Sequence, residues 1–147
     1  MLDKYYLKEF NELTPGELYE ILKLRMETFI VEQERSYKEI DGNDPKALHF
    51  FKKENESIVA YARIFEAGIT FENVSIGRIV VKDEYRKAGL GRELVKNAIR
   101  IAKDKWHAPI EISAQLRLEK FYISLGFETI SDVYTKDKVS HVNMILK

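Results

Sequence analysis

The sequence contains no cysteine among its 147 residues. Disulfide bonds, thiolate nucleophiles and cysteine-ligated metal sites are therefore excluded, and a covalent acyl-enzyme would have to use another side chain. The absence of cysteine is compatible with a reducing cytoplasm. Proline and glycine are also scarce, with three and seven residues, and neither a linker rich in them nor an internal repeat divides the chain. We therefore expect one domain that extends over residues 1–147.

An excess of charge of either sign is lacking as well, because 24 lysine and arginine residues balance 24 aspartate and glutamate residues. A general nucleic-acid binder would show a basic excess, so we expect no nucleic-acid partner. Hydrophobic runs are short, and none approaches the roughly 20 residues that a membrane-spanning helix needs. Residues 1–6 lack the apolar segment of a signal peptide. These absences predict a cytoplasmic protein that does not associate with membranes.

The residues that are present follow the periodicities of a mixed α/β domain. Thr14-Pro15-Gly16-Glu17 has the composition of a capping box and predicts an amphipathic helix that continues to about Val31. Turn-forming residues predict a loop over residues 36–45. Further helices are expected over residues 90–106 and 116–125. Strands are expected over residues 5–10, 47–52, 57–65, 74–81, 110–114, 127–130 and 139–146. This order, β-α-βββ-α-β-α-ββ, predicts a mixed sheet with helices on its faces.

The segment Arg86-Lys87-Ala88-Gly89-Leu90-Gly91-Arg92 joins a predicted strand to a predicted helix. The first N–H groups of a helix have no intrahelical partner, and the helix dipole favours an anion such as phosphate at this end. Gly89 and Gly91 lack a Cβ atom, so an anion can approach the backbone closely. The segment holds three basic residues and no acidic one. It is therefore a candidate phosphate-binding turn.

Other interpretations of this segment compete with phosphate binding. Two glycines between a strand and a helix are equally typical of an ordinary turn. A P-loop would continue with Gly-Lys-Ser/Thr, and a dinucleotide-binding fingerprint would carry a third glycine after the first strand. The segment does neither, so the sequence favours neither ATP nor NAD.

Two motifs resemble the GCN5-related N-acetyltransferases, the GNAT superfamily. The first is the Arg-x-x-Gly-x-Gly of residues 86–91, and the second is the Phe-Tyr-x-x-x-Gly-Phe of residues 121–127, about 30 residues downstream. With the predicted order of elements, the resemblance extends over nearly the whole chain. A narrower resemblance to the ElaA-type branch is carried by residues 24–25, 29–33, Tyr37, 41–42, Asp44, 60–64, 76–78 and His141.

The resemblance implies a three-layer acyl-CoA N-acyltransferase fold in which the fourth strand separates from the fifth and admits the pantetheine arm of acetyl-CoA. The main chain of Ile79 and Val81 would pair with that arm, and an N–H near Ile79 or Val80 would face the thioester oxygen. The N–H groups of residues 87–92 would hold the pyrophosphate. Gln115 stands where the family often has Asn. The cofactor-binding residues expected on this basis are Ile79, Val80, Val81, Arg86, Lys87, Ala88, Gly89, Leu90, Gly91, Arg92, Gln115, Phe121 and Tyr122.

Tyr122 is the candidate general acid, because a phenol near the thioester sulfur can protonate the departing thiolate. The competing interpretation is a core aromatic within the Phe121–Phe127 motif. Phe121 is expected to pack on the cofactor or the core.

A general base is also needed, because an amine with a pKa near 10.4 is almost entirely protonated at neutral pH. The candidates are Glu32, His141, Glu111 and His49, with Glu32 and His141 preferred. A hydrogen-bonded structural role is as plausible for either histidine. His107, beside Pro109, is expected on the surface.

The acceptor amine is expected beside a charged set on the first helix and its following loop, formed by Arg25, Glu32, Asp41 and Asp44. An acidic wall there would favour a cationic amine, whereas a solvated helix face with turn-forming aspartates is the alternative. Residues 41–44 are too few for a calcium-binding EF-hand loop, and no metal site is expected.

The resemblance favours an acetyl-CoA-dependent N-acetyltransferase that acts on a primary amine of a small molecule or peptide. A non-catalytic acyl-CoA-binding module on the same fold is the alternative, and acyl-homoserine lactone synthesis is a third. A serine hydrolase is disfavoured because no Gly-x-Ser-x-Gly motif is present. The sequence leaves the acyl chain length and the oligomeric state open, a homodimer included.

Overall fold

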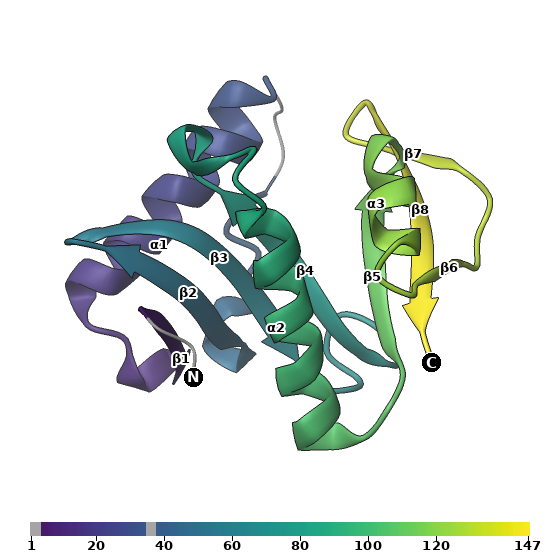
Figure 1. The fold of residues 1–147 in the computed structure, drawn as a ribbon, viewed down its shortest axis with the longest axis horizontal. Coiled ribbons are helices and arrows are strands. Elements are labelled where there is room, and N and C mark those ends of the chain that lie inside the picture. Colours follow the sequence, from purple (N-terminus) through teal and green to yellow (C-terminus); the bar gives the residue numbers. More distant parts are fainter. Residues whose placement is uncertain (1–3, 35–37) are drawn as a thin grey trace.

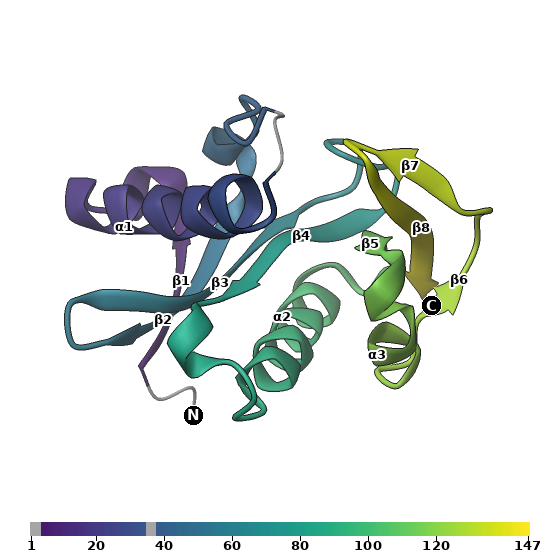
Figure 2. The same ribbon diagram turned by 90° about the horizontal axis from the view of Figure 1, so that it is seen from above.

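The computed structural model describes residues 4–34 and 38–147, which form an eight-stranded sheet of order β1-β2-β3-β4-β5-β8-β6, with β7 added beside β8. Helix α1 covers one face of the sheet, and α2 and α3 cover the other (Figure 2). The predicted three-layer mixed α/β fold is therefore confirmed. The strands are β1 (Tyr5–Glu9), β2 (Leu48–Glu54), β3 (Ser57–Phe65), β4 (Val74–Val81), β5 (Ile110–Gln115), β6 (Glu128–Thr129), β7 (Tyr134–Lys136) and β8 (Val139–Leu146), and the helices are α1 (Pro15–Arg25), α2 (Leu90–Trp106) and α3 (Glu119–Ile123).

Strands β4 and β5 form the one parallel pair that the described residues contain, and this pair is short. Their register holds only at Val74 with Ile110 and at Ser75 with Glu111. Beyond these residues the two strands diverge, as Figure 1 shows. The sheet is therefore open between β4 and β5 along most of their length, as the resemblance implied.

Two apolar clusters hold the layers together. Beneath α2, the buried side chains of Leu94 and Ala98 pack against strand residues such as Ile64 and Ile76. On the opposite face, Ile21 and Leu24 of α1 contact a second buried cluster with Phe51, Ile58, Tyr61 and Val80. Burying both faces fixes β4 in the middle of the molecule, where its free edge borders the opening.

The start of α1 matches the prediction from the sequence. Glu17 N–H donates to Thr14 Oγ1 at 3.0 Å, and Thr14 N–H donates to Glu17 Oε1 at 2.9 Å, which completes the capping box. Glu17 is buried and also accepts hydrogen bonds from Lys53 at 2.7 Å and Lys8 at 3.0 Å. Burial by itself would raise the pKa of Glu17, but the hydrogen bonds from Lys53, the Thr14 N–H and Lys8 outweigh it and lower the pKa to about 2.

Replacing Glu17 with glutamine is expected to lower the free energy of unfolding at pH 7 by about 1.5 kcal/mol, because charged hydrogen bonds to two lysines are lost. A carboxyl with a lowered folded-state pKa stabilises the protein above its ordinary value of 4.5, and this stabilisation disappears as the pH falls toward 2. Urea unfolding of both proteins should therefore show a difference at pH 7 that shrinks below pH 4.5. A difference that stays constant with pH would contradict the assignment.

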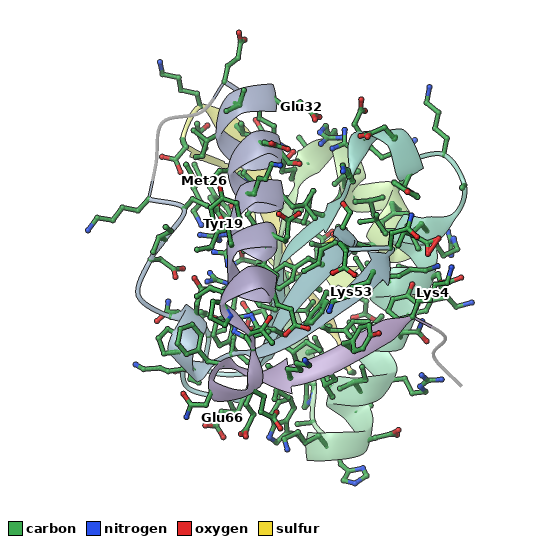
Figure 3. All side chains as sticks on the ribbon, turned by 90° about the vertical axis from the view of Figure 1, so that its left-hand side faces the viewer. Lys4, Tyr19, Met26, Glu32, Lys53 and Glu66 are labelled. Carbon is green, nitrogen blue, oxygen red and sulfur yellow. The ribbon has the colours of Figure 1, made fainter. Side chains whose placement is uncertain are left out.

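Helical structure continues to Glu32, close to the predicted end at about Val31, but its last part is not α-helical. The α-helix ends at Arg25, and Met26–Glu32 form a π-helix in which Gln33 N–H donates to Thr28 C=O at 3.2 Å. Figure 3 shows Glu32 at the far end of this continuous rod. A π-helix has a wider turn than an α-helix, and such turns are frequent at functional sites. The apolar spacing along the chain does not reveal this change.

The last third of the chain also departs from the prediction. Residues 116–125 form a 3-10 turn at Leu116–Leu118 followed by the short α3, instead of one helix, and β6 is shorter than predicted. Strand β7 was not predicted from the sequence. It is three residues long, and the turn after it uses Asp137 and Lys138 at φ values of 51° and 67° instead of glycine or asparagine. Neither the strand nor its turn carries a compositional signal. The predicted loop over 36–45 lies partly outside the described residues, and Tyr37 lies wholly outside them.

Candidate active site

A cleft of about 520 Å³ occupies the opening between β4 and β5. It is lined on the α2 and α3 side by residues such as Ile112, Phe121 and Tyr122, and on the α1 side by residues such as Phe29 and Arg63. The cleft therefore passes through the sheet and is bordered by both helical layers. Two substrates could approach each other here from opposite faces.

The N-terminus of α2 opens on this cleft. Gly89, at φ 76°, is the N-cap residue, and no side chain caps the helix. The first helical hydrogen bond runs from Glu93 N–H to Gly89 C=O at 3.1 Å, so the preceding N–H groups of residues 90–92 have no intrahelical partner. Gly91 itself lines the cleft. The predicted anion site is thus free of side-chain caps and borders the cavity.

The main chain of β4 presents its free edge to the same cleft. Lys82 N–H donates to Val59 C=O of β3 at 2.8 Å. Alternate residues of a strand direct their main-chain groups to opposite neighbours, so those of Ile79 and Val81 face the opening. The Val81 carbonyl accepts from Arg86 Nε at 2.8 Å, which agrees with this orientation.

A β-bulge interrupts β4 at Arg78 and Ile79. Tyr61 lies opposite Val80, and Arg63 lies opposite Gly77, so two residues of β4 face one of β3. Arg78, one of the two, has φ 49°. Bulges bend a strand, leave a residue unpaired and are common beside active sites. The bulge turns the Arg78 side chain toward the loop at residues 38–44.

The structure brings most of the predicted site residues together. Those that line the cleft are Glu32, Ile79, Val80, Val81, Arg86, Gly91, Gln115, Phe121, Tyr122 and His141. Five predicted cofactor-binding residues, Lys87, Ala88, Gly89, Leu90 and Arg92, are not among the lining residues. The Leu90 side chain is buried in the core, and Arg92 donates to Ser124 Oγ at 2.6 Å. These residues can reach a ligand mainly through their N–H groups.

Tyr122 combines burial with access to the cleft. Its side chain is 5% exposed, and its ring lies edge-on to Phe121 and Phe127. Within the described part of the chain its hydroxyl makes no hydrogen bond. Burial raises the pKa of Tyr122 to about 12, so the phenol keeps its proton at neutral pH. It therefore has the protonation state of a general acid.

Of the candidate bases, His141 lies at the cleft and His49 does not. His141 Nδ1 is 2.8 Å from the Val139 carbonyl, which can only accept, so Nδ1 carries the proton in the neutral ring and Nε2 is the basic nitrogen. His49 is fully buried, with Nε2 2.9 Å from the Asp44 carbonyl and Nδ1 2.6 Å from the Tyr61 hydroxyl. Burial lowers the pKa of His49. His49 is a structural histidine.

Two further residues considered in the sequence, Glu111 and His107, lie away from the cleft. Glu111 is not among the cleft-lining residues and accepts from Asn73 Nδ2 at 3.1 Å. His107 ends α2 and is exposed, as predicted.

Glu32 forms a bidentate ion pair with Arg86 across the mouth of the cleft. Arg86 Nη1 and Nη2 donate to its two carboxylate oxygens at 2.7 and 3.1 Å. The hydrogen bond from Arg86 lowers the pKa of Glu32. A carboxylate with a lowered pKa is a weak proton acceptor, so this geometry favours a positioning role. The pair ties the π-helix to the loop that precedes α2.

Three of the four residues for which the sequence left an acidic wall and a solvated face open, Arg25, Asp41 and Asp44, belong to a salt-bridge network. Arg25 is fully buried and donates to Glu39 at 2.6 Å and to Asp44 at 2.8 Å. Arg63 donates to Asp41 and Asp44, and Arg78 donates to Glu39 at 2.8 Å. Three arginines thus neutralise three carboxylates. The sequence did not predict Glu39, Arg63 and Arg78 as members. Arg63 and Arg78 lie on strands far along the chain, and Glu39 carries no signal that separates it from a loop carboxylate.

A second group of polar side chains, around Tyr134 of β7, was also not predicted from the sequence. Tyr134 of β7 donates its hydroxyl proton to Asn143 Oδ1 at 2.6 Å, and Ser113 of β5, which lines the cleft, is 2.5 Å from the Tyr134 oxygen. The Tyr134 ring stacks on His141 with centroids 5.8 Å apart. Because β7 had no signal in the sequence, this support for His141 could not be anticipated.

Comparison with known proteins gives a consistent result. A family model described as an acetyltransferase (GNAT) domain matches residues 11–147. Protein ElaA of Escherichia coli is 35% identical over 137 residues, covering 91% of this chain and 90% of ElaA. The E. coli ElaA crystal structure superposes with a TM-score of 0.91 at 33% identity, covering 97% of this chain and 98% of that one.

Two further solved structures extend the comparison. An acyl-CoA N-acyltransferase from Pseudomonas aeruginosa has a TM-score of 0.93 at 34% identity, covering 97% of this chain and 98% of that one. An aminoglycoside 6′-N-acetyltransferase complexed with coenzyme A shares the fold alone, with a TM-score of 0.72 at 14% identity over 95% of each chain. No helix in the described residues is long and apolar enough to span a bilayer. The chain belongs to the GNAT superfamily, in its ElaA-like branch, and is an N-acetyltransferase.

Proposed function

We propose that this protein transfers an acetyl group from acetyl-CoA to the primary amine of a small molecule or peptide by direct attack, in the cytoplasm. The observation that carries the proposal is one cleft bordered by the uncapped N-terminus of α2, by the free edge of β4 and by Tyr122. Proteins of this family bind acyl-CoA, and acetyl-CoA supplies the thioester from which the acyl group is taken.

The residues present fit coenzyme A. Its diphosphate suits the N–H groups of residues 90–92, which have no side-chain cap. Its amide-containing pantetheine arm suits main-chain groups that have no strand partner, and Ile79 and Val81 offer these toward the cleft. We assign the oxyanion site to the Ile79 N–H instead of the Val80 N–H, because Val80 directs its main chain toward β3.

The transfer needs two proton movements. The amine nitrogen bonds to the acyl carbon and loses a proton, while the carbon–sulfur bond breaks and the sulfur leaves as a thiol. Tyr122 holds the proton that the sulfur requires, since its pKa is about 12. We assign the removal of the amine proton to His141 Nε2, directly or through water. Glu32 is the alternative base, although its ion pair with Arg86 favours positioning.

Acetyl-CoA is expected to raise the midpoint of thermal unfolding. A ligand that binds only the folded state at about 100 times its Kd stabilises it by about 2.7 kcal/mol, which is roughly 5–10 °C for a domain of this size. Differential scanning fluorimetry with acetyl-CoA and octanoyl-CoA measures the shift and its dependence on the acyl chain. No shift at millimolar acetyl-CoA would overturn the proposal, and a shift with octanoyl-CoA alone would favour a long-chain acyl donor.

Thiol release separates transfer from binding. Free thiol is measured with acetyl-CoA and a panel of primary amines, and amine-dependent release supports the proposal. A thermal shift without thiol release from any amine would support the non-catalytic binding module instead.

A further inference from the structure

The half of the cleft on the α1 side can be separated from the half on the α2 side by the alternation of side chains. Ile112, Ala114 and Val142 belong to the core beneath α2, so their neighbours Ser113 and His141 point toward α1. Figure 2 shows β7 on this same side of the sheet. The α1-side half is therefore bounded by the π-helix, the loop at residues 38–44 and β7. We call it the acceptor half, since the N-terminus of α2 lies on the other side.

The acidic residues of the acceptor half are paired with arginines. The carboxylates that line the described part of the cleft are Glu32 and Asp41. Arg86 holds both oxygens of Glu32, and Arg63 holds both oxygens of Asp41 at 3.0 and 2.5 Å. Arg78 is a further cation 3.5 Å from Asp41. A cationic acceptor would therefore meet neutral ion pairs, in place of the acidic wall that the sequence left open as one alternative.

Unbalanced charge in this cleft is positive. Lys136 of β7 and Arg117 after β5 both line it, and no ion pair of either residue is found among the described residues, although Arg117 helps to lower the pKa of Glu32. Arg117 donates to Gln115 Oε1 at 3.0 Å near the mouth of the cleft. Lys136 lies in the acceptor half, where its ammonium makes no hydrogen bond within the described residues. An anionic group on the acceptor would be the natural partner of Lys136.

An aromatic side chain of the π-helix also lines this cleft. Phe29 of the π-helix lines the cleft from the α1 side, whereas Phe65 lies level with Ser75, at the end of the cleft opposite β7. The cleft therefore combines the apolar surface of Phe29 with one open positive charge. Such a combination suits a molecule with an apolar side chain and a carboxylate.

We propose that the acceptor is a primary amine that also carries a carboxylate and an apolar side chain, as an apolar amino acid or short peptide does, and that Lys136 binds the carboxylate. This inference rests on the proposed acetyl transfer and names its substrate class. The carboxylate takes no part in the bond changes. It orients the amine toward the acyl carbon.

The test compares matched acceptors with and without the carboxylate. Thiol release from acetyl-CoA is measured with L-phenylalanine, L-phenylalaninamide and phenethylamine, and with the corresponding leucine series. For the acids, kcat/KM is expected to exceed that of the matched amides and amines by about tenfold or more, the effect of one charged hydrogen bond. Equal or better use of the carboxylate-free acceptors would overturn the inference.

A lysine variant and a matched control locate the effect. Lys136→Gln is expected to lower kcat/KM for the acids about tenfold and to leave the amides and the KM for acetyl-CoA unchanged. Lys138→Gln removes an exposed lysine two residues away that does not line the cleft, and it should change none of these values. A Lys136→Gln loss shared equally by acids and amides would contradict a role in carboxylate binding.

Binding of the product keeps the inference testable even without turnover. N-acetylphenylalanine should raise the thermal midpoint of the wild type more than N-acetylphenethylamine does, and Lys136→Gln should abolish that difference. If no amine supports thiol release but this difference is seen, the anion site stands and the proposed transfer fails. If turnover occurs and the difference is absent, the transfer stands and the anion site fails.

Discussion

Replacing Tyr122 with phenylalanine is expected to lower kcat by about 10²- to 10⁴-fold, the usual contribution of a general acid. The phenylalanine ring keeps the edge-on contacts with Phe121 and Phe127, so the fold of α3 should be retained. Only the hydroxyl, and the proton that its pKa of about 12 retains, is lost. Steady-state kinetics of thiol release measure the loss, and the thermal shift with acetyl-CoA checks that binding persists.

The control for this variant is Tyr85→Phe. Tyr85 packs against the same apolar cluster but does not line the cleft, so its hydroxyl should not affect turnover. Turnover by Tyr122→Phe equal to that of the wild type would remove Tyr122 from the chemistry and leave it as a core aromatic. A loss of acetyl-CoA binding in parallel with turnover would assign Tyr122 to cofactor binding instead.

Replacing Arg25 with leucine is expected to lower the free energy of unfolding by about 3 kcal/mol, because the change leaves buried carboxylates without one of their cationic partners. Arg25 donates to Asp44 at 2.8 Å and to Glu39 at 2.6 Å, and all three side chains are almost wholly inaccessible to water. Arg63 and Arg78 still contact these acids, which keeps the expected loss at the lower end for buried pairs. Equilibrium unfolding in urea measures it.

An exposed ion pair serves as the comparison for Arg25. Lys4 contacts Glu54 at 2.9 Å near the edge of the sheet, and Lys4→Gln should change the free energy of unfolding by less than about 1 kcal/mol. If Arg25→Leu lowered the free energy of unfolding by as little as Lys4→Gln does, the buried ion pairs of Arg25 would not be needed for stability. Arg25→Lys should fall between the two, since one ammonium cannot bind both acids and the Glu39 carbonyl in the same geometry.

The salt-bridge network has a consequence for the active site. Glu39 joins Arg25 of α1 to Arg78 at the bulge of β4, with its carboxylate 2.6 and 2.8 Å from the two guanidinium groups. The loop at residues 38–44 is thereby fixed against both the helix and the strand whose edge borders the cleft. The shape of the acceptor half therefore depends on charges that do not themselves touch a substrate.

Local signals were sufficient for the parts of this protein that are built from neighbouring residues. The capping box at Thr14 and Glu17 set the start of α1, and the boundaries of β3 and β4 were predicted without error because their β-branched runs end at turn formers. The glycine-containing turn before α2 could be recognised because an uncapped helix N-terminus is made by consecutive residues. Much of the fold and the position of the candidate phosphate-binding turn therefore followed from the sequence.

Tertiary structure alone decided which side chains meet. His49 and His141 were both candidate bases in the sequence, and the structure shows that one is buried against Tyr61 and the other borders the cleft. Asp41 and Asp44 look like an acidic wall until Arg63, about twenty residues away, neutralises them. Periodicity records which face of an element is apolar, but it does not record which charges from other elements lie opposite. The character of the acceptor half, and the open charge of Lys136, became visible only once the sheet had brought these segments together.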